Sequence, residues 1–244
     1  MKDTIEKFTM LKITVQPCLL LIIALLLVLI ADTAMAHNVA HADQSFLTEN
    51  SGVSIIPFMY LGAKHMVTGY DHLLYLAGVI FFLFRIRDVA VFVSLFALGH
   101  SITLLTGVLA GWHVSPYLVD TVIGLSVSYK AFENLGGFKH LFSSWLDTRA
   151  AVFIFGLVHG LGLSTKLQDL EIAKDGLVTN ILAFNVGVEL GQLVALTFLL
   201  LAFSVLREST QFRRHAVSVN VLLMAAGFTL MAYQFTGYLI STGS

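Results

Sequence analysis

The sequence carries few charged residues for its length. Only 12% of its 244 residues are charged, 57% are hydrophobic, and its mean hydropathy is +0.85. Soluble domains average about 25% charged residues, so this composition excludes an ordinary water-soluble domain and indicates an integral membrane protein. The formal net charge of -1 also excludes a globally basic surface of the kind that binds nucleic acid.

Cysteine is almost absent as well. The only cysteine, Cys18, lies in an N-terminal segment that we interpret as a removable export signal, so the mature chain would contain no thiol. Disulfides, zinc-thiolate sites and covalently attached haem are thereby excluded. The sequence also lacks a Gly-x4-Gly-Lys-Ser/Thr loop, a His-Glu-x2-His motif and a Gly-x-Ser-x-Gly nucleophile turn. We therefore expect no nucleotide cofactor.

Residues 1–36 have the order of features of a secretory signal peptide. Lysines come first, an apolar core at residues 19–30 follows, and Ala34-Met35-Ala36 supplies the small residues of a cleavage site. An uncleaved anchor is the alternative, because residues 13–31 are uncharged and nearly long enough to span a bilayer. We expect cleavage after the last of these alanines, which would make His37 the new N-terminus.

The rest of the chain contains six apolar stretches suited to crossing about 30 Å of hydrocarbon as helices. They are residues 67–84, 89–109, 116–133, 150–166, 177–206 and 216–240. The links between them are short, so no separate soluble domain fits. The predicted fold is an all-α, polytopic bundle of six transmembrane helices over residues 67–244. An external, mildly amphipathic arm at residues 37–66 would precede it.

Basic residues in the links predict the orientation. If the mature N-terminus is outside, eight basic residues fall on the inner side and three on the outer side. The inner set is Arg85, Arg87, Lys130, Lys139, Arg149, Arg207, Arg213 and Arg214, and the outer set is Lys64, Lys166 and Lys174. This asymmetry follows the positive-inside rule. We therefore expect both termini outside the cytoplasmic membrane of a bacterium.

Histidines within the apolar stretches are the first candidates for a functional site. Ionisable groups in a membrane are expensive and usually mark a substrate path or a cofactor site. His65 and His72 are seven residues apart and would share one face of a continuous helix, while Asp71 could orient a histidine. His100 and His159 are expected at a similar depth. The alternative is that these groups sit in the headgroup region or bond to backbone carbonyls.

The fifth stretch adds a polar stripe at positions i, i+4 and i+7, formed by Asn185, Glu189 and Gln192. Glu189 would lie about 18 Å along the helix from Leu177, near mid-membrane, where a carboxylate must be protonated, paired or metal-bound. Interhelical hydrogen bonds are the alternative, above all for the two amides. Small-x3-small glycine pairs in the fourth and fifth stretches predict a close approach that would bring His159 toward Glu189. Converging imidazole, carboxylate and amide groups favour a divalent cation.

Four segments carry a family pattern. They are Gly62-x2-His65-x3-Gly69-Tyr70-Asp71-His72, Gly99-His100-Ser101-x-Thr103, Phe155-Gly156-Leu157-x-His159-Gly160 and Phe184-Asn185-x-Gly187-x-Glu189-x-Gly191-Gln192. In this order, over about residues 62 to 192, they resemble the HupE/UreJ family of membrane proteins. That family is regarded as nickel or cobalt permeases linked to hydrogenase and urease maturation.

The resemblance implies a set of metal contacts: His65, Asp71, His72, His100, His159 and Glu189. Polar neighbours that we expect to support them are Thr68, Ser101, Thr103, Asn185 and Gln192. After signal cleavage, the α-amine and imidazole of His37, with His41 nearby, could capture metal on the outside.

The function we expect is a secondary transporter or facilitator for a divalent transition metal, nickel or cobalt ahead of zinc, that supplies metalloenzyme maturation. The alternatives are an intramembrane zinc-dependent hydrolase in which Glu189 activates a water, and a haem protein with His100 and His159 as axial ligands. The expected partners are the metal ion and the lipid bilayer, with no nucleic acid. Association into a homo-oligomer is compatible with the sequence.

Overall fold

The computed structural model describes residues 52–141, 147–169, 176–208 and 210–243, all within a unit formed by residues 49–244. Every regular element in these ranges is a helix, which confirms the all-α class for them. The helices are α2 (Ile55–Thr68), α3 (Tyr70–Ile80), α4 (Ile86–Ala110), α5 (Pro116–Asn134), α6 (Gly137–Leu141), α7 (Thr148–Asp169), α8 (Leu177–Glu208) and α9 (Thr210–Gly243). The expected signal peptide, His37 and His41 lie outside the described residues.

Among these helices, α4, α7, α8 and most of α9 are long and apolar enough to cross a membrane. The chain is therefore a membrane protein. The two other expected spans have helices that miss this standard for physical reasons. Over the third, α5 carries Asp120, Lys130 and Glu133. Over the first, the helix is interrupted and α3 has only 11 residues.

The interruption between α2 and α3 lies at Gly69, whose backbone is extended. Its amide still donates to the carbonyl of His65, and its own carbonyl accepts from Leu73, so both half-helices are capped through this residue. A Cβ at this position would lie 2.5 Å from Nδ1 of His72 and 3.0 Å from Oδ1 of Asp71. Glycine is therefore needed here for space, because the two polar side chains fold back onto the break.

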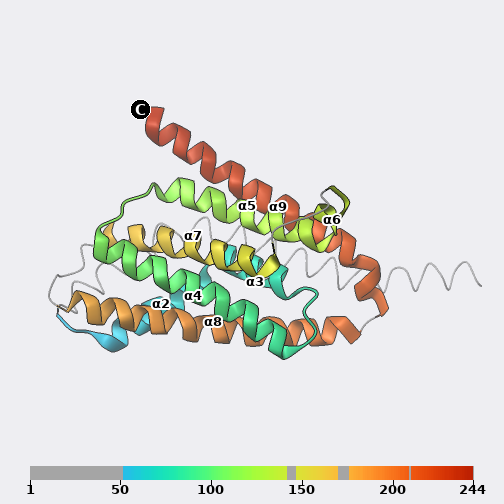
Figure 1. Ribbon diagram of the computed structural model, residues 1–244, viewed down its shortest axis with the longest axis horizontal. Coiled ribbons are helices and arrows are strands. Elements are labelled where there is room, and N and C mark those ends of the chain that lie inside the picture. The colour runs from blue at the N-terminus through green and yellow to red at the C-terminus, as the bar shows by residue number, and fades with distance from the viewer. Residues whose placement is uncertain (1–51, 142–146, 170–175, 209, 244) are drawn as a thin grey trace, which may run out of the picture. The chain divides into compact units, whose positions relative to one another are not determined.

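The long helices pack in three close pairs, α2 with α8, α4 with α7 and α5 with α9 (Figure 1). Glycines make each approach close. Gly156 and Gly160 of α7 face the carbonyls of Phe96 and His100 on α4, where any Cβ would clash with backbone. Gly187 and Gly191 of α8 face α2 in the same way. The glycine pairs thus serve close approach, as small residues do in membrane helices, but each pairs with a different helix from the one expected.

The α2 helix crosses residue 66, where we expected the external arm to end. We expected residues 37–66 to form an external arm, but α2 runs through that boundary to Thr68 and packs along α8. Gly62 allows this contact, because a Cβ there would clash with the Phe184 carbonyl oxygen. This contact was not expected because α2, with 14 residues, is too short to be recognised as a span.

The short α3 is held at its C-terminal end by Arg207 of α8. The guanidinium donates to the carbonyl of Ile80 and, at 3.1 Å, to the carbonyl of Phe81. A cation at a helix C-terminus also complements the helix dipole. The rings of Phe84 and Phe203 cover the same guanidinium, at 4.7 and 5.1 Å from their centroids. This anchoring fixes the helix that carries His72.

Candidate metal centre

Four histidines from four helices lie close together, with His72 next to the other three. Measured between ring centroids, His72 of α3 lies 5.0 Å from His65 of α2, 5.3 Å from His159 of α7 and 6.5 Å from His100 of α4. His72, His100 and His159 are buried, and His65 is half-buried. The structure therefore brings together the four histidines that the sequence singled out, and it does so between α2, α3, α4 and α7.

The spacing of the rings is close to that of imidazoles on a shared ion. A metal-nitrogen bond of about 2.0 to 2.1 Å puts the ring centroid about 3.2 Å from the metal, so two such rings at 90° to 109° have centroids about 4.5 to 5.2 Å apart. The 5.0 Å separation of His72 from His65 falls in this range, the 5.3 Å separation of His72 from His159 lies just above it, and His100 lies farther out at 6.5 Å. The rings meet edge to face, and in the described part of the chain no group of three or more ligand side chains is already closed on one point. A shared ion would therefore require the rings to rotate and His100 to move inward.

Hydrogen bonds orient two of the rings. Nδ1 of His72 lies 2.9 Å from Oδ1 of Asp71, and Nδ1 of His159 lies 2.7 Å from the carbonyl oxygen of Phe155. A carboxylate or carbonyl can only accept, so each Nδ1 carries the proton when the imidazole is neutral. Nε2 is then the nitrogen left with a lone pair. Metal-bound histidines are commonly oriented in this way.

Several of the remaining nitrogens are buried without a partner. Nε2 of His159 and both ring nitrogens of His100 have no hydrogen-bond partner in the part of the chain that the structure describes. Buried polar atoms are nearly always paired, and an unpaired one costs about 1 to 3 kcal/mol. Three unpaired nitrogens on two histidines of one cluster are hard to explain by packing. A cation held between the rings would satisfy Nε2 of His159 and the nitrogen of His100 that carries the lone pair.

Aromatic side chains pack around the histidines, and the sequence analysis did not identify them. Phe96 of α4 packs on His159 at 4.9 Å and on His100 at 6.1 Å, and Tyr75 of α3 packs on His159 at 5.5 Å, all between centroids. Tyr75 follows His72 by three residues, and Phe96 precedes His100 by four, so both lie on the histidine faces of their helices. That spacing was the signal available in the sequence.

The expected supporting residues bond elsewhere. Nδ2 of Asn185 donates to the Ser101 hydroxyl at 2.9 Å, which joins α8 to α4 beside His100. Thr103 donates to the Leu157 carbonyl at 2.6 Å, and Gln192 donates to the Val93 carbonyl at 3.5 Å. Thr68 is exposed and bonds to the Lys64 carbonyl of its own helix. Asn185, Ser101, Thr103 and Gln192 therefore join one helix to another, whereas Thr68 bonds only within α2.

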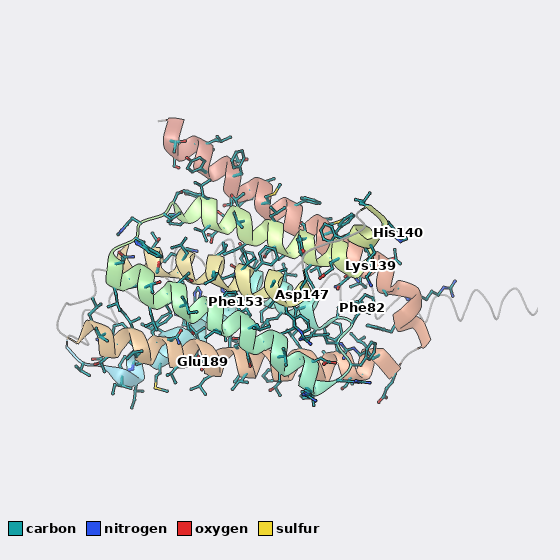
Figure 2. All side chains as sticks on the ribbon, in the orientation of Figure 1. Phe82, Lys139, His140, Asp147, Phe153 and Glu189 are labelled. Carbon is teal, nitrogen blue, oxygen red and sulfur yellow. The ribbon has the colours of Figure 1, made fainter. Side chains whose placement is uncertain are left out.

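Glu189 is not placed with the histidines. Its side chain is exposed, like those of Val186 and Leu190 on the same helix, and it is labelled on α8 in Figure 2. Because α7 packs on α4 and α8 packs on α2, the expected approach of His159 to Glu189 is wrong. The stripe itself explains the error. Glu189 is about 40° around the helix from Asn185, and Gln192 is about 20° away in the opposite sense, so the buried edge of α8 passes between them.

A known protein family matches most of the chain. The pattern that defines the HupE / UreJ protein family matches residues 41–242. The chain belongs to the HupE/UreJ family. This match covers most of the sequence and includes the four histidines of the cluster. Neither a curated protein nor a solved structure matches the chain. The site of this HupE/UreJ protein therefore has to be interpreted from its own residues.

Proposed function

We propose that this protein carries a divalent transition metal, nickel or cobalt, across the cytoplasmic membrane, and that His65, His72, His100 and His159 bind it on the way. The observation that carries the proposal is the set of buried, unpartnered nitrogens on His100 and His159 beside His72. The association of the HupE/UreJ family with nickel and cobalt transport and with hydrogenase or urease maturation supports it.

The donor set favours borderline divalent metals. Imidazole nitrogens without any thiolate suit nickel, cobalt, zinc or copper(II), whereas magnesium and calcium prefer oxygen. Each neutral imidazole would replace a water of the hydrated ion, and Asp71 would place a negative charge next to His72. The buried site would therefore select against hard cations by its ligands and partly balance the charge of the cargo.

The broken helix suits a transport site. Half-helices that end at a substrate site are common in secondary transporters, where irregular backbone is tolerated if it lines a cavity. In our proposal α2 and α3 together make the first of six crossings and α5 makes the third, with both termini outside. The membrane potential would then drive the cation inward with about 2.3 kcal/mol per charge per 100 mV.

Neither alternative gains support from the structure. The hydrolase needed Glu189 beside the histidines to activate a water, and Glu189 is exposed on another helix pair. The haem protein needed His100 and His159 on opposite faces of a porphyrin, but the ring of Phe96 packs directly against both. A transport site therefore explains the arrangement best.

The test is metal flux. Purified full-length protein in proteoliposomes should take up cobalt or nickel, and His72→Ala and His159→Ala should each abolish saturable uptake. His140→Ala is the matched control, because His140 is exposed on α6, where it is labelled in Figure 2. Normal uptake by both cluster variants, with correct folding shown by size-exclusion chromatography, would contradict the proposal.

A further inference from the structure

A second polar cluster lies on the side of the bundle where α5 ends and α7 begins. Glu133 of α5 accepts a hydrogen bond on each carboxylate oxygen, from Nζ of Lys130 at 2.6 Å and from the Thr148 hydroxyl at 2.5 Å. The side chains of Lys130 and Glu133 are only 10% and 18% exposed. The sequence interpretation counted Lys130 as a topological charge and did not consider Glu133. An ion pair this well enclosed needs a further explanation, because burying two charges is costly.

Neighbouring helices pack closely around the cluster. Gly78 of α3 leaves room for the stem of Lys130, whose Cγ would lie 3.3 Å from a Cβ at that glycine. Asn134 donates at 2.9 Å both to the Gly78 carbonyl and to the amide oxygen of Asn220 on α9. Four helices, α3, α5, α7 and α9, therefore meet at this cluster.

Tyr75 connects the cluster to the histidines. Its ring packs on His159 at 5.5 Å and on Phe155 at 5.8 Å, and Phe155 in turn packs on Tyr129 beside Lys130. The Tyr75 hydroxyl is buried without a hydrogen-bond partner among the described residues, and it lies within electrostatic range of Glu133. A buried hydroxyl without a hydrogen-bond partner has an oxygen that can still coordinate a cation.

We propose that the carboxylate of Glu133, with the hydroxyls of Thr148 and Tyr75, is a second cation-binding position, which the ammonium of Lys130 occupies when no metal is there. This rests on the proposed transport function. Thr148 is eleven residues before His159 on α7, so the two positions are separated by about 16 Å along the helix. A metal that leaves the histidines would displace the ammonium, whose flexible stem allows it to withdraw.

The chemistry of the second position suits release. Oxygen donors hold a borderline metal more weakly than imidazoles do, and conduction requires sites from which the ion can leave. The returning ammonium restores the ion pair with Glu133 and closes the position behind the metal. The basic residues at this end predict that it faces the cytoplasm, so release would be inward.

Metal stoichiometry tests the proposal. Equilibrium dialysis of purified full-length protein against cobalt, with elemental analysis, should give one ion per chain for the wild type and two for Lys130→Met. The double variant Lys130→Met/Glu133→Gln should bind one. Lys139→Met is the matched control, because Lys139 is an exposed lysine on α6, just after the end of α5 (Figure 2). This control variant should bind one ion. Equal stoichiometry of Lys130→Met and the wild type would overturn the proposal.

Two further variants separate this proposal from the transport function. His159→Ala/Lys130→Met should hold the ion at the histidines only weakly and keep the ion at Glu133, whereas unchanged binding in His72→Ala and His159→Ala would count against the histidine site alone. Should Lys130→Met fail to fold, Glu133→Gln decides. It should bind one cobalt ion like the wild type and transport it about tenfold more slowly or worse, because a charge-assisted contact on the path is lost. Transport by Glu133→Gln at the wild-type rate would refute the second position.

Discussion

The imidazole rings of His72 and His159 lie 5.3 Å apart, and Nδ1 of each is bonded to a different oxygen acceptor, the Asp71 carboxylate and the Phe155 carbonyl. The two histidines come from α3 and α7, which belong to different parts of the bundle. This relationship leaves Nε2 of both rings as the nitrogen available to a cation. It is the core of the proposed metal site.

Asp71 should act through His72. We expect Asp71→Asn to weaken cobalt binding about 10- to 100-fold, because the carboxylate fixes the tautomer of His72 and raises its basicity as a ligand. The measurement is the dissociation constant by isothermal titration of the purified protein. Asp71→Glu should recover part of the affinity. Wild-type affinity in Asp71→Asn would show that the carboxylate has no positioning role.

Glu189 should not contribute to metal affinity. Since its side chain is exposed on α8, we expect Glu189→Gln to keep the cobalt dissociation constant within about twofold, the size of a surface effect. The comparison is with His159→Ala, titrated under the same conditions. A loss of affinity in Glu189→Gln as large as that of His159→Ala would restore the sequence-based hypothesis that this carboxylate is a ligand.

Gly160 should be intolerant of any side chain. A Cβ there would clash with the His100 carbonyl oxygen, which is backbone and cannot swing away. We expect Gly160→Ala to lower stability by about 1 to 3 kcal/mol, as overpacking does, and to weaken metal binding by separating His100 from His159. Thermal unfolding in detergent measures the first effect. Gly243→Ala is the control, because a Cβ at Gly243 has no atom within 4 Å, and equal melting temperatures of the two variants would contradict the packing argument.

Acid should displace the metal. Imidazole binds a metal only when its ligating nitrogen is unprotonated, so protons compete with the cation and affinity must fall as the pH is lowered. We expect the cobalt dissociation constant to rise at least about tenfold between about pH 7.5 and about pH 5.5. Removing one histidine should make this dependence shallower. A pH-independent dissociation constant would exclude imidazoles as the ligands.

The sequence predicted the fold class and the four histidines for the same physical reason. Polar side chains are expensive in apolar stretches, so His72, His100 and His159 stood out against their surroundings and pointed to the bundle interior. The break at Gly69 could not be predicted, because a lone glycine in an apolar stretch also occurs in continuous membrane helices. The break nevertheless decides how His65 and Asp71 reach the site.

The sequence also did not predict which helices pack against each other. A small-x3-small pair such as Gly156 and Gly160 predicts close contact but does not name the partner helix. Glu189 was misplaced because a stripe at i, i+4 and i+7 covers about 60° of helix surface, enough to include both sides of a buried boundary. Glu133 was missed because its partner Lys130 had already been explained by topology. Tertiary contacts were required to recognise each of these residues.

The most direct measurement of the central claim is X-ray absorption spectroscopy at the cobalt or nickel edge of the metal-loaded, full-length protein. The account predicts a shell of nitrogen and oxygen donors without sulfur, with the scattering pattern of at least three imidazoles, and the loss of one imidazole in His159→Ala. A spectrum with no imidazole scattering, or one that is identical in His159→Ala, would show that the metal is bound elsewhere.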